Sequence, residues 1–231
     1  MKRILILNKK EGETPLEALE NFRNKNKKYK NVKMTYAGRL DPLVSGLLLV
    51  LVGDAVKEKE KYIKLSKEYT FSVLFGFATD TYDILGKVVS GMQYGAGSFH
   101  KEKLEEKIKK SLKFFTGKFI QAYPMYSSRT VGGKPLFTYA RLGKKVKVPV
   151  HEVEVKNLKF HGITTIRSKD FLRNIDRRIK KVTGDFRQRE ILNIWHNELE
   201  KKNQEKFFIA NFQIKCSSGT YVRGIANSLG E

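Results

Sequence analysis

Two charged residues, Arg39 and Asp41, stand in a glycine- and proline-containing turn that runs directly into an aliphatic stretch. Aspartate before proline is a common start of a turn, so Asp41 could act as a turn cap and Arg39 as a surface cation. However, the aliphatic residues 47–52 predict a strand buried on both faces, which places the carboxylate at the edge of the core. A carboxylate there needs a cation to stay ionised. An ionised aspartate that faces an anionic ligand could act as a nucleophile.

The composition points to an anionic partner. The 231 residues include 46 Lys and Arg against 24 Asp and Glu, a net charge of +22. Such an excess favours nucleic acid or an anionic membrane, although a lysine-rich proteome would also produce it. The aliphatic run is too short to span a bilayer, and the apolar part of the N-terminus is too short for a signal peptide. We therefore expect a cytoplasmic, nucleic-acid-binding protein that does not engage a membrane.

Cysteine and histidine usage argues against disulfides and metal sites. The chain has one cysteine, Cys216, and four scattered histidines. One cysteine excludes an internal disulfide and fits a reducing compartment. The histidines and the cysteine lack metal-ligand spacing, so no metal site is predicted.

The expected elements mix strands and helices without a regular alternation. Thr14, Pro15 and Glu17 form a capping-box pattern that predicts a helix over 14–23. Further helices are expected over 55–67, 101–114 and 220–231 and within the basic, proline-free segment 164–206. Strands are expected over 3–8, 47–53, 68–76 and 207–219 and within 117–155. Residues 79–90 should form a tight acidic turn that returns as a strand, followed by a glycine-rich loop at 91–97. This pattern predicts an α+β fold with a largely antiparallel sheet flanked by helices.

Five blocks of the sequence resemble, in order, the TruB family of tRNA pseudouridine synthases. YAGRLDPLVSGLLLVLVGDAVK, residues 36–57, is similar to the family's catalytic segment, roughly G-H-T-G-x-L-D-P-x-A-x-G. The other blocks are LILNKKEGETPLEAL from residue 5, KEYTFSVLFGFATDTYDILGKV from residue 67, QAYPMYSSRTVGGKPLFTYARLG from residue 121 and KCSSGTYVRGIANSLGE from residue 215. The resemblance covers about 1–157 and 207–231.

The resemblance implies a pseudouridine synthase fold and an isomerase that acts on tRNA. The family converts the T-loop uridine at position 55 of tRNA to pseudouridine. It detaches the uracil from C1′, turns it and rejoins it through C5, without cofactor or metal. We expect one catalytic domain, residues 1–231, with a basic helical insertion at about 164–206. Because the chain stops at Glu231, we expect a short form without the family's C-terminal PUA-type domain, and a monomer.

Three residues fall on the family's catalytic positions. The aspartate of L-D-P is Asp41, the nucleophile or general catalyst. The tyrosine of K-x-Y is Tyr69, which would stack on the flipped base. The arginine of T-Y-I-R is Arg223, which would pair with the carboxylate. An arginine close to a carboxylate lowers the pKa of that carboxylate, and an aromatic face recovers part of the cost of flipping a base.

Lys9, Lys67, Lys134 and Tyr139 look like RNA contacts by the same alignment. We also expect RNA contacts from Tyr36, Arg39 and Tyr221, although Tyr221 could instead pack under the sheet. Tyr36 stands where the family has histidine. A tyrosine can still stack in the place of the flipped base, but it carries no charge near neutral pH.

Other functions stay open at this point. One alternative is a non-catalytic tRNA-binding protein or folding chaperone, and another is the catalytic subunit of a guide-RNA-dependent synthase. A ribosomal-type basic domain is a third, although it would not need a buried aspartate. A further hypothesis is that the basic helices within 164–206 grip the tRNA elbow.

Overall fold

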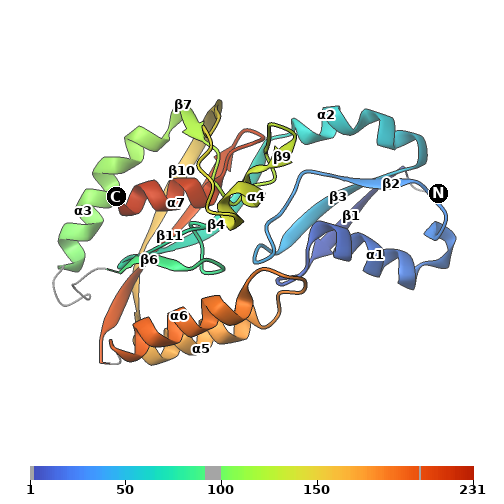
Figure 1. The fold of residues 1–231 in the computed structure, drawn as a ribbon. Coiled ribbons are helices and arrows are strands. Elements are labelled where there is room, and N and C mark those ends of the chain that lie inside the picture. The colour runs from blue at the N-terminus through green and yellow to red at the C-terminus, as the bar shows by residue number, and fades with distance from the viewer. Residues whose placement is uncertain (1–2, 92–99, 203) are drawn as a thin grey trace. The chain divides into compact units, whose positions relative to one another are not determined.

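The computed structural model describes residues 3–91, 100–202 and 204–231, so the glycine-rich loop predicted at 91–97 lies almost entirely outside the described residues. The chain forms two compact units. Unit 1 comprises Met1–Leu65 and Asn174–Gln188, and unit 2 comprises Ser66–Arg173 and Arg189–Glu231. Figure 1 shows the elements of both. Within the described ranges, no helix has the length and apolar character needed to cross a bilayer.

Unit 1 is built on a three-stranded antiparallel sheet with the strand order β1-β3-β2. Thr14 caps α1 with both hydrogen bonds of the capping box, as the sequence predicted. The elements are β1 (Ile4–Lys9), α1 (Pro15–Lys25), the 3₁₀ helix η1 (Lys27–Tyr29), β2 (Met34–Ala37), β3 (Gly46–Val52), the 3₁₀ helix η2 (Gly53–Glu58), α2 (Lys59–Ile63) and the last residues of α5 (Ser168–Ile179).

The aliphatic strand β3 is apolar because both of its faces are covered. Leu48, Val50 and Val52 pack in one cluster with residues of α1. Leu51 belongs to a second cluster, into which residues of α2 pack. The predicted doubly buried strand is therefore confirmed for most of its length, whereas Leu47 at its start is 76% exposed.

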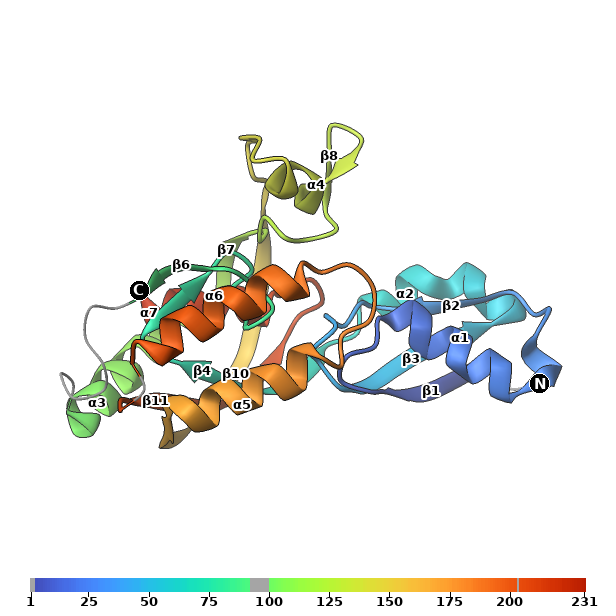
Figure 2. The same cartoon turned by 60° about the horizontal axis from the view of Figure 1, so that its bottom comes forward.

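Unit 2 is built on a four-stranded antiparallel sheet with the order β4-β11-β10-β7. Residues of α3 and α7 pack with this sheet in one cluster around Phe212 and Ile225, and Figure 2 shows the strands of this unit from another side. The elements are β4 (Lys67–Leu74), β5 (Phe77–Thr79), β6 (Val88–Gly91), α3 (Lys101–Ser111), the 3₁₀ helix η4 (Leu112–Phe115), β7 (Gly117–Ala122), β8 (Thr130–Val131), β9 (Lys134–Pro135), α4 (Leu136–Arg141), β10 (Val150–Arg167), α6 (Gln188–Glu200, from Arg189), β11 (Lys206–Cys216), α7 (Val222–Gly230) and the first half of α5.

The basic segment predicted as helical contains the two helices α5 and α6, but its first residues complete the long strand β10. Helix α6 is part of the core of unit 2. Trp195 is 1% exposed, its indole N–H donates to the carbonyl of Ile84 at 3.1 Å, and the rings of Phe77 and Phe171 pack against it. Deleting the whole segment would therefore remove core residues as well as surface charge.

A buried lysine holds two loops of unit 1 together. Lys9 ends β1 and has no exposed surface. Its ammonium donates to the carbonyls of Glu13 at 2.6 Å, Lys10 at 3.0 Å and Pro42 at 3.2 Å, which provides one acceptor for each of its three protons. Burial lowers the pKa of Lys9, while the nearby carboxylates of Glu13 and Asp41 raise it.

This arrangement differs from the RNA contact predicted for Lys9. A side chain without exposed surface does not reach RNA in this conformation, so the structure assigns Lys9 a supporting role. In the sequence, a lysine at a strand end looks like a surface charge. The acceptors of Lys9 are backbone carbonyls, which residues of any type can supply, so the sequence does not reveal them.

Replacing Lys9 by methionine should destabilise the protein. Lys9→Met fills similar space but removes three hydrogen bonds, and the carbonyl of Glu13 loses its donor at 2.6 Å. The carbonyls of Lys10 and Pro42 keep the amides of Glu13 and Gly12 as donors. We therefore expect the free energy of unfolding to fall by about 1–3 kcal/mol. Urea denaturation followed by circular dichroism measures it. Lys10→Met is the matched control, because the neighbouring side chain of Lys10 is exposed. Equal stability of the two variants would contradict the supporting role.

Candidate active site

The turn between β2 and β3 presents Asp41 in unit 1. Gly38 opens this turn with φ of +98°, a conformation that favours glycine. The carbonyl of Asp41 accepts a hydrogen bond from the amide of Val44 at 3.0 Å, and its side chain is half-buried. The charge of Asp41 also acts on Lys9 and raises the pKa of that lysine. The ammonium of Lys9 donates to the carbonyl of Pro42, the residue after Asp41. The turn therefore fixes a half-buried carboxylate beside a buried cation.

Tyr36 and Arg39 precede Asp41 in the same part of unit 1. Tyr36 lies on β2, half-buried, and packs against the cluster that also contains Val50. The ammonium of Lys59 lies 6.0 Å from the centre of its ring. Arg39 is exposed in the turn. Packing on one side keeps the Tyr36 ring in place, as a stacking role would require.

In unit 2, Arg223 joins two loops to the start of α7. Its guanidinium donates to the carbonyl of Thr81 at 2.7 Å and to the carbonyl of Tyr126 at 3.0 Å. The side chain is half-buried. One planar fork that serves two acceptors is a geometry that lysine does not reproduce. The orientation of Arg223 is thus set by backbone atoms on either side of it.

Gln121 fixes the residue before α7. Its side-chain oxygen accepts from the amide of Tyr221 at 2.8 Å, and its side-chain nitrogen donates to the carbonyl of Tyr221 at 3.0 Å. The Tyr221 ring meets the edge of Tyr123, with ring centres 5.7 Å apart. Sequence reasoning assigned no role to Gln121. The sequence did hold one clue to this role: Gln121 is a polar residue two positions after Phe119, so both side chains lie on the inward side of β7.

Tyr69 and Lys67 lie on one side of β4, because they are two residues apart in a strand. Tyr69 pairs with Ile214 of β11 and packs, half-buried, against the cluster into which Val222 of α7 also packs. Lys67 pairs with Cys216, and burial lowers its pKa. Tyr69 and Arg223 therefore belong to one unit, whereas Asp41 belongs to the other.

Lys134 and Tyr139 lie near the short hairpin β8–β9. The hydroxyl of Tyr139 donates to the carbonyl of Val131 at 2.9 Å, so this side chain ties α4 to the hairpin. Lys134 on β9 is exposed. Lys134 is accessible to a phosphate, while the hydroxyl of Tyr139 already has a structural partner.

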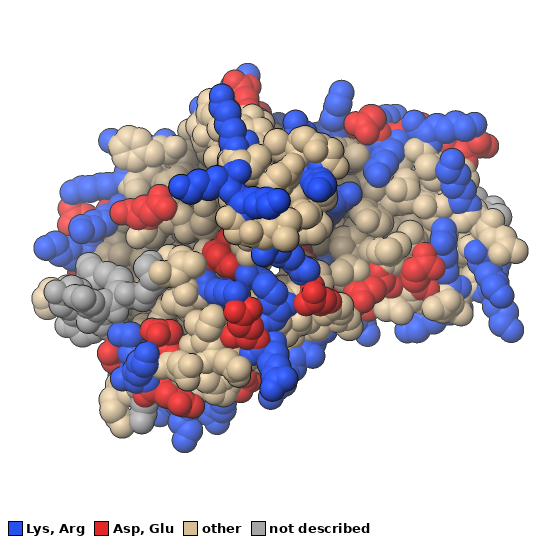
Figure 3. Space-filling view, viewed as in Figure 1, with Lys and Arg blue, Asp and Glu red and all other residues tan. Residues whose placement is uncertain are grey.

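The surface is rich in cations, in keeping with the net charge. Figure 3 shows Lys and Arg side chains spread widely over the visible face, with fewer acidic groups between them. Among the described residues, no group of three or more His, Cys, Asp or Glu side chains is arranged to hold a metal ion.

Comparison with known proteins identifies the family. Residues 25–176 match the TruB family pseudouridylate synthase N-terminal domain. The chain is 33% identical to the tRNA pseudouridine synthase B of Lactobacillus acidophilus, over 99% of this chain and 62% of that protein. It is also 33% identical to the tRNA pseudouridine synthase B of Endomicrobium trichonymphae, over 98% of this chain and 76% of that protein. The chain thus spans less than two thirds of the length of the first of these relatives.

The fold has a counterpart among solved structures. A chain in the crystal structure of a Cbf5–Nop10–Gar1 complex aligns with 98% of this chain and 43% of its own length, with a TM-score of 0.50 and 17% identity. This similarity supports the α+β fold predicted from the sequence. The match over residues 25–176 and the 33% identity to a relative covered over 76% of its length lead to one conclusion: the chain belongs to the TruB family of pseudouridylate synthases.

Proposed function

We propose that this protein is a tRNA pseudouridine synthase that isomerises the T-loop uridine at position 55 of tRNA. The observation that carries the proposal is the half-buried carboxylate of Asp41, at the family's catalytic position, on a turn fixed by a buried lysine. The relatives named tRNA pseudouridine synthase B support the choice of tRNA as substrate. The proposed compartment is the cytoplasm.

The proposed reaction is an isomerisation that needs no external oxidant or reductant. The bond between N1 of uracil and C1′ of the ribose breaks, and a bond between C5 and C1′ forms. C5 loses its proton and N1 gains one, so atoms and electrons balance. The uridine must first leave its stack, at a cost of a few kcal/mol.

Three side chains carry the proposed chemistry. Asp41, as an anion, is the nucleophile or general catalyst. Arg223 pairs with it and favours the ionised carboxylate, and the ring of Tyr69 stacks on the extruded base. Asp41 lies in unit 1 and the other two residues lie in unit 2, so their meeting around the uridine is part of the proposal.

The remaining proposed contacts are with the T arm of the tRNA. The exposed cations Arg39 and Lys134 would bind phosphates. Tyr36 would stack in the place that the flipped base leaves, and Lys67, Tyr139 and Tyr221 would line the path of the RNA.

Removing the charge of Asp41 should abolish turnover and leave binding intact. Asp41→Asn keeps the shape but loses the anion, so we expect pseudouridine formation in an unmodified T-arm hairpin to fall about a thousandfold or more. Mapping of pseudouridine measures turnover, and a filter-binding assay measures affinity. Asp54→Asn, an exposed aspartate of the same unit, is the matched control. Binding without turnover in wild type and mutant alike would instead support a tRNA chaperone.

Replacing Arg223 by lysine should show whether activity depends on the positive charge alone or also on the geometry of the guanidinium. Arg223→Lys keeps a cation but cannot serve the carbonyls of Thr81 and Tyr126 with one planar fork. We expect the single-turnover rate to fall about 100-fold because the cation is displaced, with RNA affinity unchanged. Arg177→Lys on the exposed side of α5 is the control. A wild-type rate in Arg223→Lys would show that only a positive charge is required at this position.

A further inference from the structure

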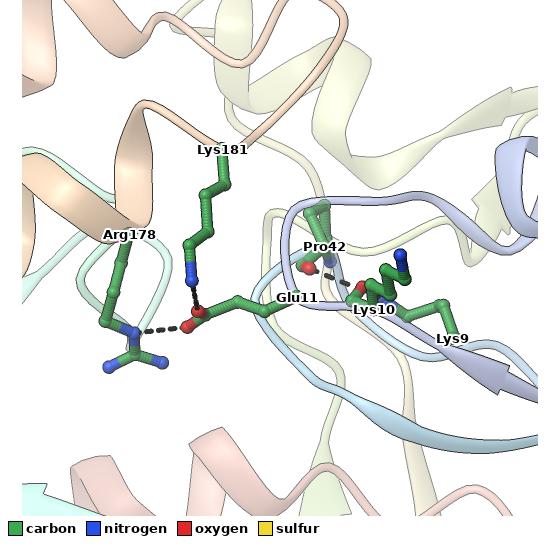
Figure 4. A network of polar contacts seen from close by, with 6 residues as sticks. All are labelled: Lys9, Lys10, Glu11, Pro42, Arg178 and Lys181. Carbon is green, nitrogen blue, oxygen red and sulfur yellow. Dashed lines mark hydrogen bonds and ion pairs between the residues drawn. The ribbon is translucent and has the colours of Figure 1, made fainter.

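The loop Lys10–Glu13 of unit 1 lies between two partners. On one side is the turn that carries Asp41: the amide of Gly12 donates to the carbonyl of Pro42 at 2.8 Å, and Lys9 donates to the same carbonyl at 3.2 Å. On the other side is the chain segment 178–183, which begins with the last two residues of α5 and belongs to the same unit. Figure 4 shows the contact between Lys9 and Pro42 and the contacts that Arg178 and Lys181 make with Glu11.

Two cations of this segment converge on one carboxylate of the loop. Arg178 donates through Nε to one oxygen of Glu11, and Lys181 donates through Nζ to the other at 2.8 Å. The side chain of Glu11 is 22% exposed. Burial raises the pKa of Glu11, but the hydrogen bonds and charges of Lys181 and Arg178 outweigh it, so the net pKa is lowered. Glu11 is therefore an anion at neutral pH, and both ion pairs persist there.

The backbones of the loop and the segment also touch. The amide of Thr183 donates to the carbonyl of Gly12 at 3.3 Å, and the Thr183 hydroxyl donates to Glu17 of α1. Gly12 has φ of +97°, and a Cβ at this position would lie 2.3 Å from the carbonyl oxygen of Lys181. Close approach of the two backbones explains why glycine stands there.

We infer that Arg178 and Lys181 are positioning residues, which act through Glu11 to hold the loop that supports the Asp41–Pro42 turn. The chain of contacts runs from the two cations to Glu11, from its neighbour Gly12 to Pro42, and from there to Asp41. This role differs from the grip on RNA expected for the basic segment, because Nε of Arg178 and Nζ of Lys181 are directed at Glu11. The inference depends on the proposed function for its kinetic readout alone.

Neutralising Glu11 tests the inference in the full chain. Glu11→Gln breaks both ion pairs, so we expect the single-turnover rate on a T-arm hairpin at saturating protein to fall about tenfold, since small displacements of a reacting group are costly. RNA affinity should stay equal or increase, because the variant loses a negative charge near two cations. Glu20→Gln is the matched control: Glu20 lies in the same unit and pairs with Arg23 on α1. We expect wild-type values for it.

A second variant separates positioning from RNA contact. In Arg178→Gln/Lys181→Gln the rate should fall as in Glu11→Gln, and adding Glu11→Gln should cause no further loss, because all three residues act through one contact. If the two cations bound RNA instead, the double variant would weaken binding and flatten its salt dependence, while Glu11→Gln would leave the rate unchanged. That result would overturn the inference.

A readout without RNA keeps the inference testable if the protein proves inactive. The Gly12 amide donates to Pro42, so its hydrogen exchange reports whether the loop is held. In Glu11→Gln we expect this exchange, measured by NMR, to accelerate about tenfold, with amides of β3 unchanged. An unchanged exchange rate would overturn the inference. An inactive wild type with faster Gly12 exchange in the variant would refute the proposed function and support the positioning role.

Discussion

The geometry of unit 1 depends on an ammonium that cannot be left unpaired. A buried cation is costly unless its protons are accepted, and Lys9 has no exposed surface. Its three carbonyl acceptors come from the loop after β1 and from the turn before β3. The requirement for acceptors therefore folds two loops around one side chain. Asp41 precedes the proline that supplies one of these carbonyls, so the position of the carboxylate is linked to the pairing of the lysine.

In unit 2, too, side chains order loops through hydrogen bonds to backbone groups. Arg223 donates to the carbonyls of Thr81 and Tyr126, and Gln121 satisfies both backbone groups of Tyr221. In each case a side chain with a defined set of donors or acceptors orders irregular backbone. Hydrogen bonds of this kind, together with packing, lock the residues of a functional site in place. Both units thus hold in fixed positions the side chains that the proposed function requires.

Local signals in the sequence predicted local structure well. Thr14 and Glu17 defined the start of α1, and the aliphatic run predicted β3, since both signals act over a few residues. Helix α4 (Leu136–Arg141) was missed inside a region expected to form strands because it is only six residues long. The family motifs indicated Asp41, Tyr69 and Arg223. The supporting partners were not predictable, because Lys9 and Arg223 bind backbone carbonyls, and any residue can supply a carbonyl.

Net charge describes a protein's long-range attraction to RNA, but not which cations meet the RNA. The excess of +22 counts every lysine and arginine equally. Lys9 is buried, Lys87 is paired with Glu190, and Arg178 and Lys181 converge on Glu11. A cation that already holds a carboxylate must give up that contact to bind a phosphate, so its gain on binding is reduced. The footprint of the proposed RNA binding should therefore be sought among exposed cations such as Arg39 and Lys134. The basic segment after β10 contributes structure as well as charge.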